Sequence, residues 1–433
     1  MKIIKSLILI TPWLCLTPFV SAQNSRPLTL DETIRRVVTT YPSVKQAEEA
    51  VKSAGYNIRM AQAALYPILN ASASYTRVDP VATVHFEELD LTFDPKNNYN
   101  AGISLRQTLF DFGKNRPIIG AAKEKENLSR LQQEKLFKML ALNTVQVYYM
   151  NCFARQAIHI KKQELSDYEE MLRQAEVRMK SGSATSFDLL NTQVGQSAVN
   201  TQLTELTSNL KTLQVQLSVL ADTTISEVIP LDESIEIKPN LSTLDNLLTT
   251  AYAARPDMQS VEKQISIARL EENAARRAYN PSLDLSATAG GKNGYPPHID
   301  HMKMNYEVGV TLSVPLYEGG RRKQSASIAR SAYSSAVFQK ELIEKQVMQE
   351  VSENYNTLTS DFEKIGQLSR QVTLAQQAYD QAKVNYKAGS ITNLELLTSS
   401  TNLSNSRLQL LQAKINYQVS YFKLQVSVGE RIW

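Results

Sequence analysis

The chain has 433 residues, of which 47 are Lys or Arg and 43 are Asp or Glu, so its formal net charge is only +4. The 42% hydrophobic content excludes a disordered chain, and the modest Gly and Pro counts exclude a collagen-like one. Because no basic excess is present, we expect no nucleic-acid partner. A chain of this length ordinarily predicts two or three globular domains.

Residues 1–22 have the layout of a secretory signal peptide. Two lysines precede an apolar stretch from Leu7 to Leu16, and small residues follow at positions 20–22. The alternative, an anchoring helix, is disfavoured because Pro12 and Pro18 interrupt a stretch that is already too short to span a membrane. We therefore predict cleavage after Ala22 and export of the mature chain.

The mature chain keeps a single cysteine, Cys152, so no intramolecular disulfide is available to it. The residues around it, from Tyr148 to Phe153, resemble a helix interior. We expect Cys152 to be a small buried hydrophobe rather than a catalytic thiol. No later run of eighteen apolar residues occurs, so a membrane-resident form would have to use strands.

The sequence contains an internal duplication. Residues from Leu30 to Ala73 recur from Leu244 to Ala287 at a constant offset of 214. The segment from Tyr99 to Gly113 recurs from Tyr306 to Gly320 at an offset of 207, which then holds to the end of each copy. The copies therefore differ mainly by seven residues in the loop near 81–97.

Each copy changes its hydrophobic period along the chain. Apolar residues from Val347 to Tyr386 follow one another at steps of three or four, which predicts a long helix packed in coiled-coil fashion. No proline interrupts the stretch from Gly320 to Lys387, so at ~1.5 Å per residue the helix would be roughly 100 Å long. The molecule must therefore be elongated.

Strict alternation of apolar and polar residues replaces the helical period at Ser282–Ala289 and at Asn305–Val314. The polar positions are small and hydroxylated, which is typical of strands that face lipid on one side and a water-filled lumen on the other. A soluble sheet packed on a core is the alternative. Four strands per chain are too few to close a membrane barrel. Two copies would give eight strands and three copies twelve, and the long helices favour the wider barrel.

The expected organisation is a duplicated unit of helix, β-hairpin and long helical hairpin. Each hairpin tip contains a glycine expected to cap the first helix and a threonine expected to cap the second. The expected segments are a first repeat at 23–222 with its β-hairpin at about 67–110 and its helical hairpin at about 114–221 (tip 181–185), a connector at 223–240, and a second repeat at 241–433 with its β-hairpin at about 281–316 and its helical hairpin at about 320–429 (tip 388–392).

With these features the chain resembles the outer-membrane efflux protein family, whose type is TolC. The resemblance covers nearly the whole mature chain, and its strength lies in the duplicated order of short motifs rather than in any one of them. The motifs are Pro67 and Pro281-Ser282-Leu283, Leu109 to Gly113 and Val314 to Gly320, Gly182-Ser183-Ala184-Thr185 with Asp188-Leu189-Leu190, and Gly389-Ser390-Ile391-Thr392 with Glu395-Leu396-Leu397.

The resemblance implies a mainly α fold with a membrane β-barrel contribution, in which a homotrimer forms a twelve-stranded barrel in outer-membrane lipid and a helical tunnel in the periplasm. It implies an exit duct for efflux or type I secretion, gated at its periplasmic tips. It also implies two partners, a periplasmic adaptor protein and an inner-membrane pump of the resistance-nodulation-division or ABC type. The resemblance implies that the pump, rather than the duct, largely selects what is exported.

The resemblance further implies pore and gate residues. Asp188 and Glu395 match a pore-facing acidic position, and Tyr386 matches a gate tyrosine. A second acidic residue and a gate-linking arginine of the family fall at Thr398 and Ile391, so the closing network must differ here. As an alternative, the two acids could simply complement the positive ends of their helices. The tip residues implied to meet the adaptor are Gly182, Ser183, Thr185, Gly389, Ser390 and Thr392.

Two rival classes remain to be weighed. An enzyme or metal protein could use the His298 and His301 pair beside Asp300, but a metal site needs further ligands and a held geometry. The sequence contains no Gly-rich phosphate loop and no Gly-x-Ser-x-Gly motif. We therefore expect no catalysis, no cofactor and no metal. An exported coiled-coil structural or adhesive protein is the second rival, and it leaves the paired alternating strands unexplained.

Overall fold

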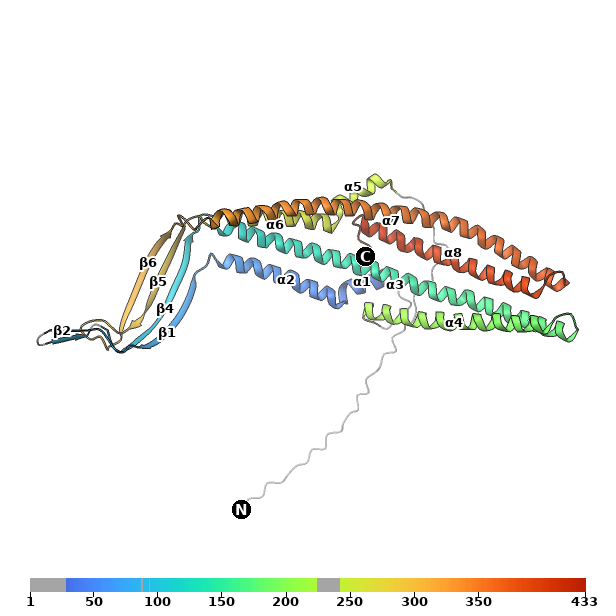
Figure 1. Ribbon diagram of the computed structural model, residues 1–433, viewed down its shortest axis with the longest axis horizontal. Helices are drawn as coiled ribbons and strands as arrows, with labels where there is room; N and C mark the ends of the chain where they lie inside the picture. The colour runs from blue at the N-terminus through green and yellow to red at the C-terminus, as the bar shows by residue number, and fades with distance from the viewer. Residues whose placement is uncertain (1–28, 87–88, 93, 224–241) are drawn as a thin grey trace, which may run out of the picture.

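A computed structural model describes residues 29–86, 89–92, 94–223 and 242–433. The predicted signal peptide and all of the predicted connector except Thr223 lie outside these residues. The molecule is elongated, with strands at one end and two helical tips at the other (Figure 1). Its elements are α1 (Leu30–Thr40), α2 (Pro42–Ala63), β1 (Ile68–Arg77), β2 (Thr83–Phe86), β3 (Leu89–Thr92), β4 (Asn97–Phe110), α3 (Asn115–Lys180), α4 (Ser186–Ala221), α5 (Leu244–Ala254), α6 (Pro256–Arg277), β5 (Ser282–Lys292), β6 (Lys303–Ser313), α7 (Arg321–Ala388) and α8 (Asn393–Ser427).

The two β-hairpins form one antiparallel sheet with the strand order β1-β4-β5-β6. The register places Ala71 opposite Ile103, so the apolar positions of β1 and β4 share a face. Strands β4 and β5 approach closely, since a Cβ on Gly290 would lie 2.3 Å from the carbonyl oxygen of Ala101. Within this four-stranded sheet, the outer strands β1 and β6 each have one unpaired edge.

A feature that sequence reasoning missed is the small hairpin formed by β2 and β3. It lies inside the connection between β1 and β4, where the first copy is longer than the second. The four-residue strands are too short to give a clear alternating pattern.

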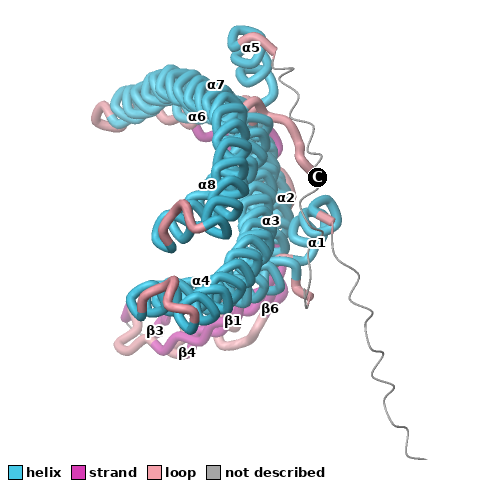
Figure 2. The backbone as a smooth tube through the Cα atoms, turned by 90° about the vertical axis from the view of Figure 1, so that its right-hand side faces the viewer, coloured by secondary structure: helices cyan, strands magenta, loops and turns pink. Residues whose placement is uncertain are grey.

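The helices form a single curved layer. Helix α3 runs through its middle and packs on α2 and α6 near the sheet and on α4 and α8 near the tips, while α7 packs on α6 and then on α8. Figure 2, viewed from the tip end, shows the layer as an open arc, with α1 and α5 on its convex side. The arc therefore ends in α2 and α4 on one edge and in α7 on the other.

The length of α3 and α7 follows from their uninterrupted periodic sequences. They contain 66 and 68 residues, which at ~1.5 Å per residue corresponds to roughly 100 Å each. Within the described part of the chain, no helix is long and apolar enough to cross a membrane.

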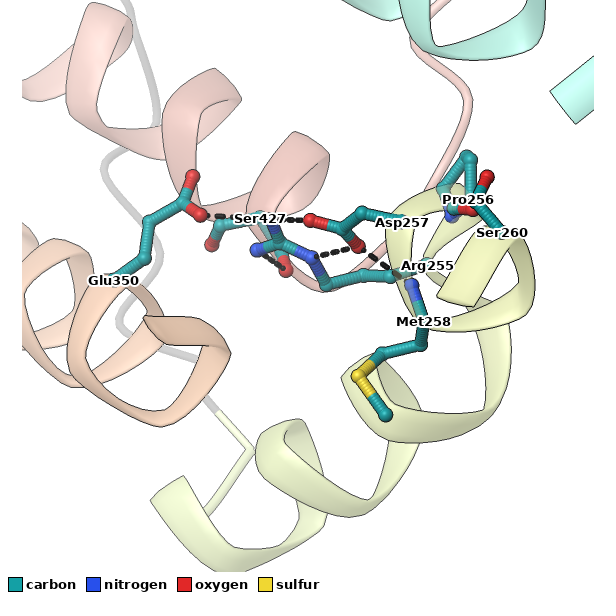
Figure 3. Close-up of polar contacts among 7 residues, drawn as sticks. All are labelled: Arg255, Pro256, Asp257, Met258, Ser260, Glu350 and Ser427. Atoms are coloured by element: carbon teal, nitrogen blue, oxygen red, sulfur yellow. Dashed lines mark hydrogen bonds and ion pairs between the residues drawn. The ribbon is translucent and has the colours of Figure 1, made fainter. Parts of the chain in front are cut away.

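A polar junction joins α6, α7 and α8 (Figure 3). The start of α6 lies near the middle of the molecule (Figure 1). The guanidinium of Arg255 donates to both carboxylate oxygens of Asp257 at 2.9 and 2.7 Å, to Glu350 at 2.7 Å and to the carbonyl oxygen of Ser427 at 2.9 Å. In the first copy the equivalent residue, at the offset of 214, is Tyr41. The junction therefore belongs to the second copy alone.

Candidate functional site at the helical tips

The tips are two short turns at the end of the molecule opposite the sheet. Gly389 has φ +76° and is the C-cap of α7, as the sequence predicts. The matching prediction for Gly182 is wrong by one residue. Helix α3 ends at Lys180, and its C-cap is Ser181. Gly182 is the next residue and adopts the left-handed conformation, with φ +73°. Both glycines occupy a conformation that side chains disfavour.

Each tip continues into a capping box. The backbone N–H of Thr185 donates to Asp188 at 2.9 Å, and the N–H of Asp188 donates back to the Thr185 hydroxyl at 3.2 Å. The corresponding distances between Thr392 and Glu395 are 2.7 and 3.3 Å. Both threonines are therefore N-caps, as predicted, and both acids satisfy the first turn of their own helix.

The two capping acids differ in exposure. Asp188 is half-buried, whereas Glu395 is exposed. Hydrogen bonds from the backbone N–H and the hydroxyl of Thr392 hold the pKa of the Glu395 carboxyl below its ordinary value. Glu395 therefore remains charged at neutral pH and can present that charge to solvent while it caps α8.

Arg178 joins the first hairpin to the second. It lies in the last turn of α3, and its guanidinium carbon lies 4.3 Å from the centroid of the Tyr386 ring. The same guanidinium donates to the carbonyl oxygens of Tyr386 and Lys387, the latter at 3.0 Å. A cation at the C-terminal end of α7 is favourable both for the ring and for these carbonyl groups.

Tyr386 itself is only 3% exposed and packs in the core of the tips. Burial raises the pKa of its hydroxyl, and the negative charge of Asp188 raises it further, against the opposing effect of Arg178. The tyrosine is therefore neutral at physiological pH. Sequence reasoning found Tyr386 but missed Arg178, although an arginine was missing at Ile391 and could have been sought elsewhere at the tips.

Asn393 forms a second link between the hairpins. It is the first residue of α8 and is 4% exposed. Its side-chain amide donates to the backbone carbonyl of Asp188 at 3.0 Å and to the hydroxyl of Thr192 at 2.9 Å. The start of α8 is thus fixed to the start of α4 by two hydrogen bonds.

The two positions where family gate residues are missing have local roles. Ile391 packs against the apolar core of the tips. The hydroxyl of Thr398 donates to the carbonyl of Leu394 in its own helix at 2.7 Å. That core consists of Tyr168, Met171, Val199, Tyr379, Tyr386, Leu396, Leu397 and Leu403.

The remaining tip residues are occupied within their own turns. The Ser183 backbone N–H donates to the carbonyl of Arg178 at 2.8 Å, and the Ser390 hydroxyl donates to the carbonyl of Asn385 at 3.0 Å. Both serines are exposed to solvent. The tips therefore present short, ordered turns with polar atoms at the surface.

The rival chemical sites are not near the tips. The rings of His298 and His301 lie with their centroids 5.6 Å apart in the loop between β5 and β6, at the opposite end of the molecule. No group of three His, Cys, Asp or Glu residues that could hold a metal occurs in the described ranges. Cys152 is 1% exposed, and burial raises the pKa of its thiol to about 12.

Several known proteins resemble this chain in sequence and in fold. A model of the outer membrane efflux protein family matches residues 34–221 and 247–430. The alkaline protease secretion protein AprF of Pseudomonas aeruginosa is 24% identical over 381 residues, which cover 86% of this chain and 78% of AprF. The outer membrane protein TolC of Escherichia coli is 22% identical over 400 residues, with coverages of 90% and 79%.

Solved structures show the same fold at low sequence identity. The outer membrane protein VceC of Vibrio cholerae has a TM-score of 0.77 and 19% identity, covering 93% of this chain and 97% of VceC. The CmeC outer membrane channel of Campylobacter jejuni has a TM-score of 0.78 and 18% identity, with coverages of 92% and 85%.

Proposed function

The chain belongs to the outer membrane efflux protein family, and on that premise we propose how this outer-membrane channel protein assembles and closes as an exit duct for efflux or type I secretion. Its fold is the predicted duplicated unit, except that two helices rather than one precede each β-hairpin: α1 and α2 in the first copy, α5 and α6 in the second. The relatives are named as secretion, efflux and channel proteins, so the candidate residues are those that line, close or dock the duct.

The duct is a homotrimer whose two repeats, 23–222 and 241–433, contribute equally to its wall. The support is the open arc, because one four-stranded sheet cannot close a barrel and three of them supply twelve strands. The helices at the free edges carry exposed apolar side chains that a neighbouring copy would cover. These include Tyr56 and Met60 on α2, Val194 and Val215 on α4, and Phe338 and Leu374 on α7.

In this assembly the strands lie in outer-membrane lipid and the helices extend into the periplasm. The tips are then the end that faces the inner membrane. We expect a periplasmic adaptor to dock on them and to connect the duct to a pump of the resistance-nodulation-division or ABC type. The docking turns contain Gly182, Ser183, Thr185, Gly389, Ser390 and Thr392.

The observation that carries the gate is the pair of links between the two hairpins of one chain. Arg178 holds the end of α7, and Asn393 holds the start of α8 to α4, so the tips cannot separate until both links break. Farther from the tips, hydrogen bonds such as that between Tyr168 and Thr401 keep α3 on α8. Around a threefold axis, three copies of Glu395 would concentrate negative charge and favour cations. Asp188 would add to this ring from the first hairpin.

Single-channel recording in a planar lipid bilayer tests this function. The purified mature protein should insert and give a small, long-lived conductance typical of a nearly closed pore. A trimeric mass in detergent, with both helix and strand in the circular dichroism spectrum, is expected alongside. A water-soluble dimer that gives no conductance would refute the channel and favour an exported coiled-coil protein with a structural or adhesive role.

The cargo follows from the pump rather than from the duct. Relatives carry names as different as alkaline protease secretion protein, pyoverdine export protein and toluene efflux pump protein. A deletion strain scored for sensitivity to dyes, antibiotics and metals, and for missing secreted proteins, identifies the cargo class.

A further inference from the structure

A half-open hollow of 460 Å³ lies where the sheet meets the helices, between the C-terminal end of α6 and the segment that joins β6 to α7. Three basic side chains, Arg276, Arg322 and Lys323, line it. Two tyrosines, Tyr279 and Tyr317, lie among them. The remaining wall is formed by Pro315, Leu316, Glu318, Gly320 and Ala326.

The hollow has a surplus of positive charge. Arg276 is neutralised by Glu272 at 2.6 Å, and Glu318 lies 3.5 Å from Arg321, which is outside the wall. Arg322 and Lys323 form no ion pair with any described residue, and the guanidinium of Arg322 stands 5.8 Å from the Tyr279 ring centroid. Two cations therefore remain available to a ligand.

The internal duplication shows that the fold does not require two of the three basic residues. At the offsets of 214 and 207, Arg276 corresponds to Gln62, Arg322 to Asn115 and Lys323 to Arg116. The equivalent place between α2 and α3 in the first copy thus has two neutral amides beside one arginine. The same elements fold in both copies, so folding does not require Arg276 or Arg322.

The position of the hollow indicates what that ligand is. Strand β6 ends at Ser313 and α7 begins at Arg321, so the hollow lies at the boundary between the sheet and the periplasmic helices. Leu316 is 92% exposed and Tyr317 is 87% exposed at the same place. Basic residues and tyrosines at a membrane boundary meet lipid headgroups, and an exposed leucine beside them suits an acyl chain.

We propose that this hollow binds the headgroup phosphate of an anionic phospholipid. Arg322 and Lys323 supply the positive charge, and a planar guanidinium can offer a phosphate two parallel hydrogen bonds. Tyr279 and Tyr317 border the headgroup, and Leu316 lies against the first part of the acyl chain. The proposal rests on the placement of the strands in the membrane but is independent of the gate.

The test removes the two cations that form no ion pair. The variant R322N/K323Q neutralises both, and R330N/K345Q removes the same charge from exposed positions elsewhere on α7. The purified full-length trimer in detergent is titrated with short-chain phosphatidylglycerol, short-chain phosphatidylcholine and inorganic phosphate, and binding is followed by native mass spectrometry.

The wild type and R330N/K345Q should bind phosphatidylglycerol alike, and R322N/K323Q should bind it about thirtyfold more weakly, as expected for the loss of two cations near an anionic lipid. Equal binding by all three proteins would overturn the proposal. If the wild type bound phosphatidylcholine as tightly as phosphatidylglycerol, the role of the anionic charge would be overturned. If it bound inorganic phosphate as tightly as phosphatidylglycerol, the assignment of the bound phosphate to a lipid headgroup would be overturned. Bilayer conductance of the wild type tests the channel separately, so a failed lipid site and a failed channel are told apart.

Discussion

The guanidinium of Arg178 lies 4.3 Å from the centre of the Tyr386 ring, although the two residues are 208 positions apart in the chain. The contact joins the end of α3 to the end of α7, and thereby the first hairpin to the second. The tips thus contain a cation, although Ile391 occupies the position of the family's gate-linking arginine. We propose that Arg178 supplies this part of the closing network from the opposite hairpin.

Replacing Arg178 with glutamine should loosen the gate. The change removes a cation–π contact and charge-assisted hydrogen bonds, together about 2 kcal/mol, which is roughly a thirtyfold change in the ratio of closed to open pores. The measurement is the open probability of single channels. As a matched control, R173Q removes an arginine whose partner, Glu170, lies in the same helix. If R178Q conducts like R173Q, the link does not hold the gate.

The acidic ring should bind cations at the tips. We expect D188A/E395A to lose block by a multivalent cation added on the periplasmic side, whereas E205A, which alters an exposed acid farther along α4, keeps it. Unchanged block in D188A/E395A would leave Asp188 and Glu395 with their capping role alone.

Block through Glu395 should also depend on pH in a defined direction. The folded-state pKa of Glu395 lies below the ordinary value of about 4.3, so its carboxylate stays charged at pH 5. The negative charge is lost only as the pH falls through the lower folded-state pKa. The capping stability that it supplies is present above the ordinary pKa and disappears over the same acidic range. Conductance block measured from pH 7 to pH 3 checks this, and a midpoint above 5 would contradict it.

Gly195 should not tolerate a side chain. A Cβ at this position would lie 2.3 Å from a ring carbon of Tyr168, so G195A should destabilise the first hairpin by about 1–3 kcal/mol through overpacking. The double variant Y168L/G195A should recover much of this loss. Gly366 has open space around it, and G366A should be neutral or stabilising. Thermal unfolding followed by circular dichroism ranks the three proteins, and equal midpoints for G195A and G366A would refute the clash.

The Arg255 junction should contribute strongly to stability. Replacing Arg255 with methionine leaves Asp257 partly buried and unpaired, at a cost of about 3 kcal/mol. R130M breaks an exposed pair with Glu126 and should cost less than about 1 kcal/mol. Thermal unfolding compares the two variants, and equal shifts would show that the junction is no stronger than a surface pair.

The junction also predicts how stability responds to acid. Burial favours the neutral form of Asp257, but the Arg255 guanidinium outweighs it and holds the pKa of that carboxyl below its ordinary value. The stabilisation is therefore complete above about pH 4 and is lost as the pH falls through the lower folded value. R255M should lack this acid-dependent component.

Cys152 should be inert in the folded protein. With burial raising its pKa to about 12, almost no thiolate exists at pH 8, and the thiol is shielded from reagents. Maleimide labelling should occur only after unfolding. Labelling of the native trimer at a rate typical of a free cysteine would show that α3 opens at this point.

The order of elements was open to prediction because it depends on local sequence. The heptad-like spacing from Val347 to Tyr386 predicts the long helix, and the alternation at Asn305–Val314 predicts a strand, since each period follows from backbone geometry. Thr392 and Glu395, three residues apart, predict the start of a helix, because a capping box forms within a single turn.

The sequence by itself thus determined the long helices, the strands of the four-stranded sheet, the duplication and the two capped tips of this protein. Only the tertiary structure decided which residues from the two copies meet. Arg178 finds Tyr386, Asn393 finds the backbone of Asp188, and Arg276 and Arg322 come to line one hollow. These contacts depend on the way long helices cross and register against one another, and a local pattern of apolar and polar residues fixes each helix without fixing its neighbour's position.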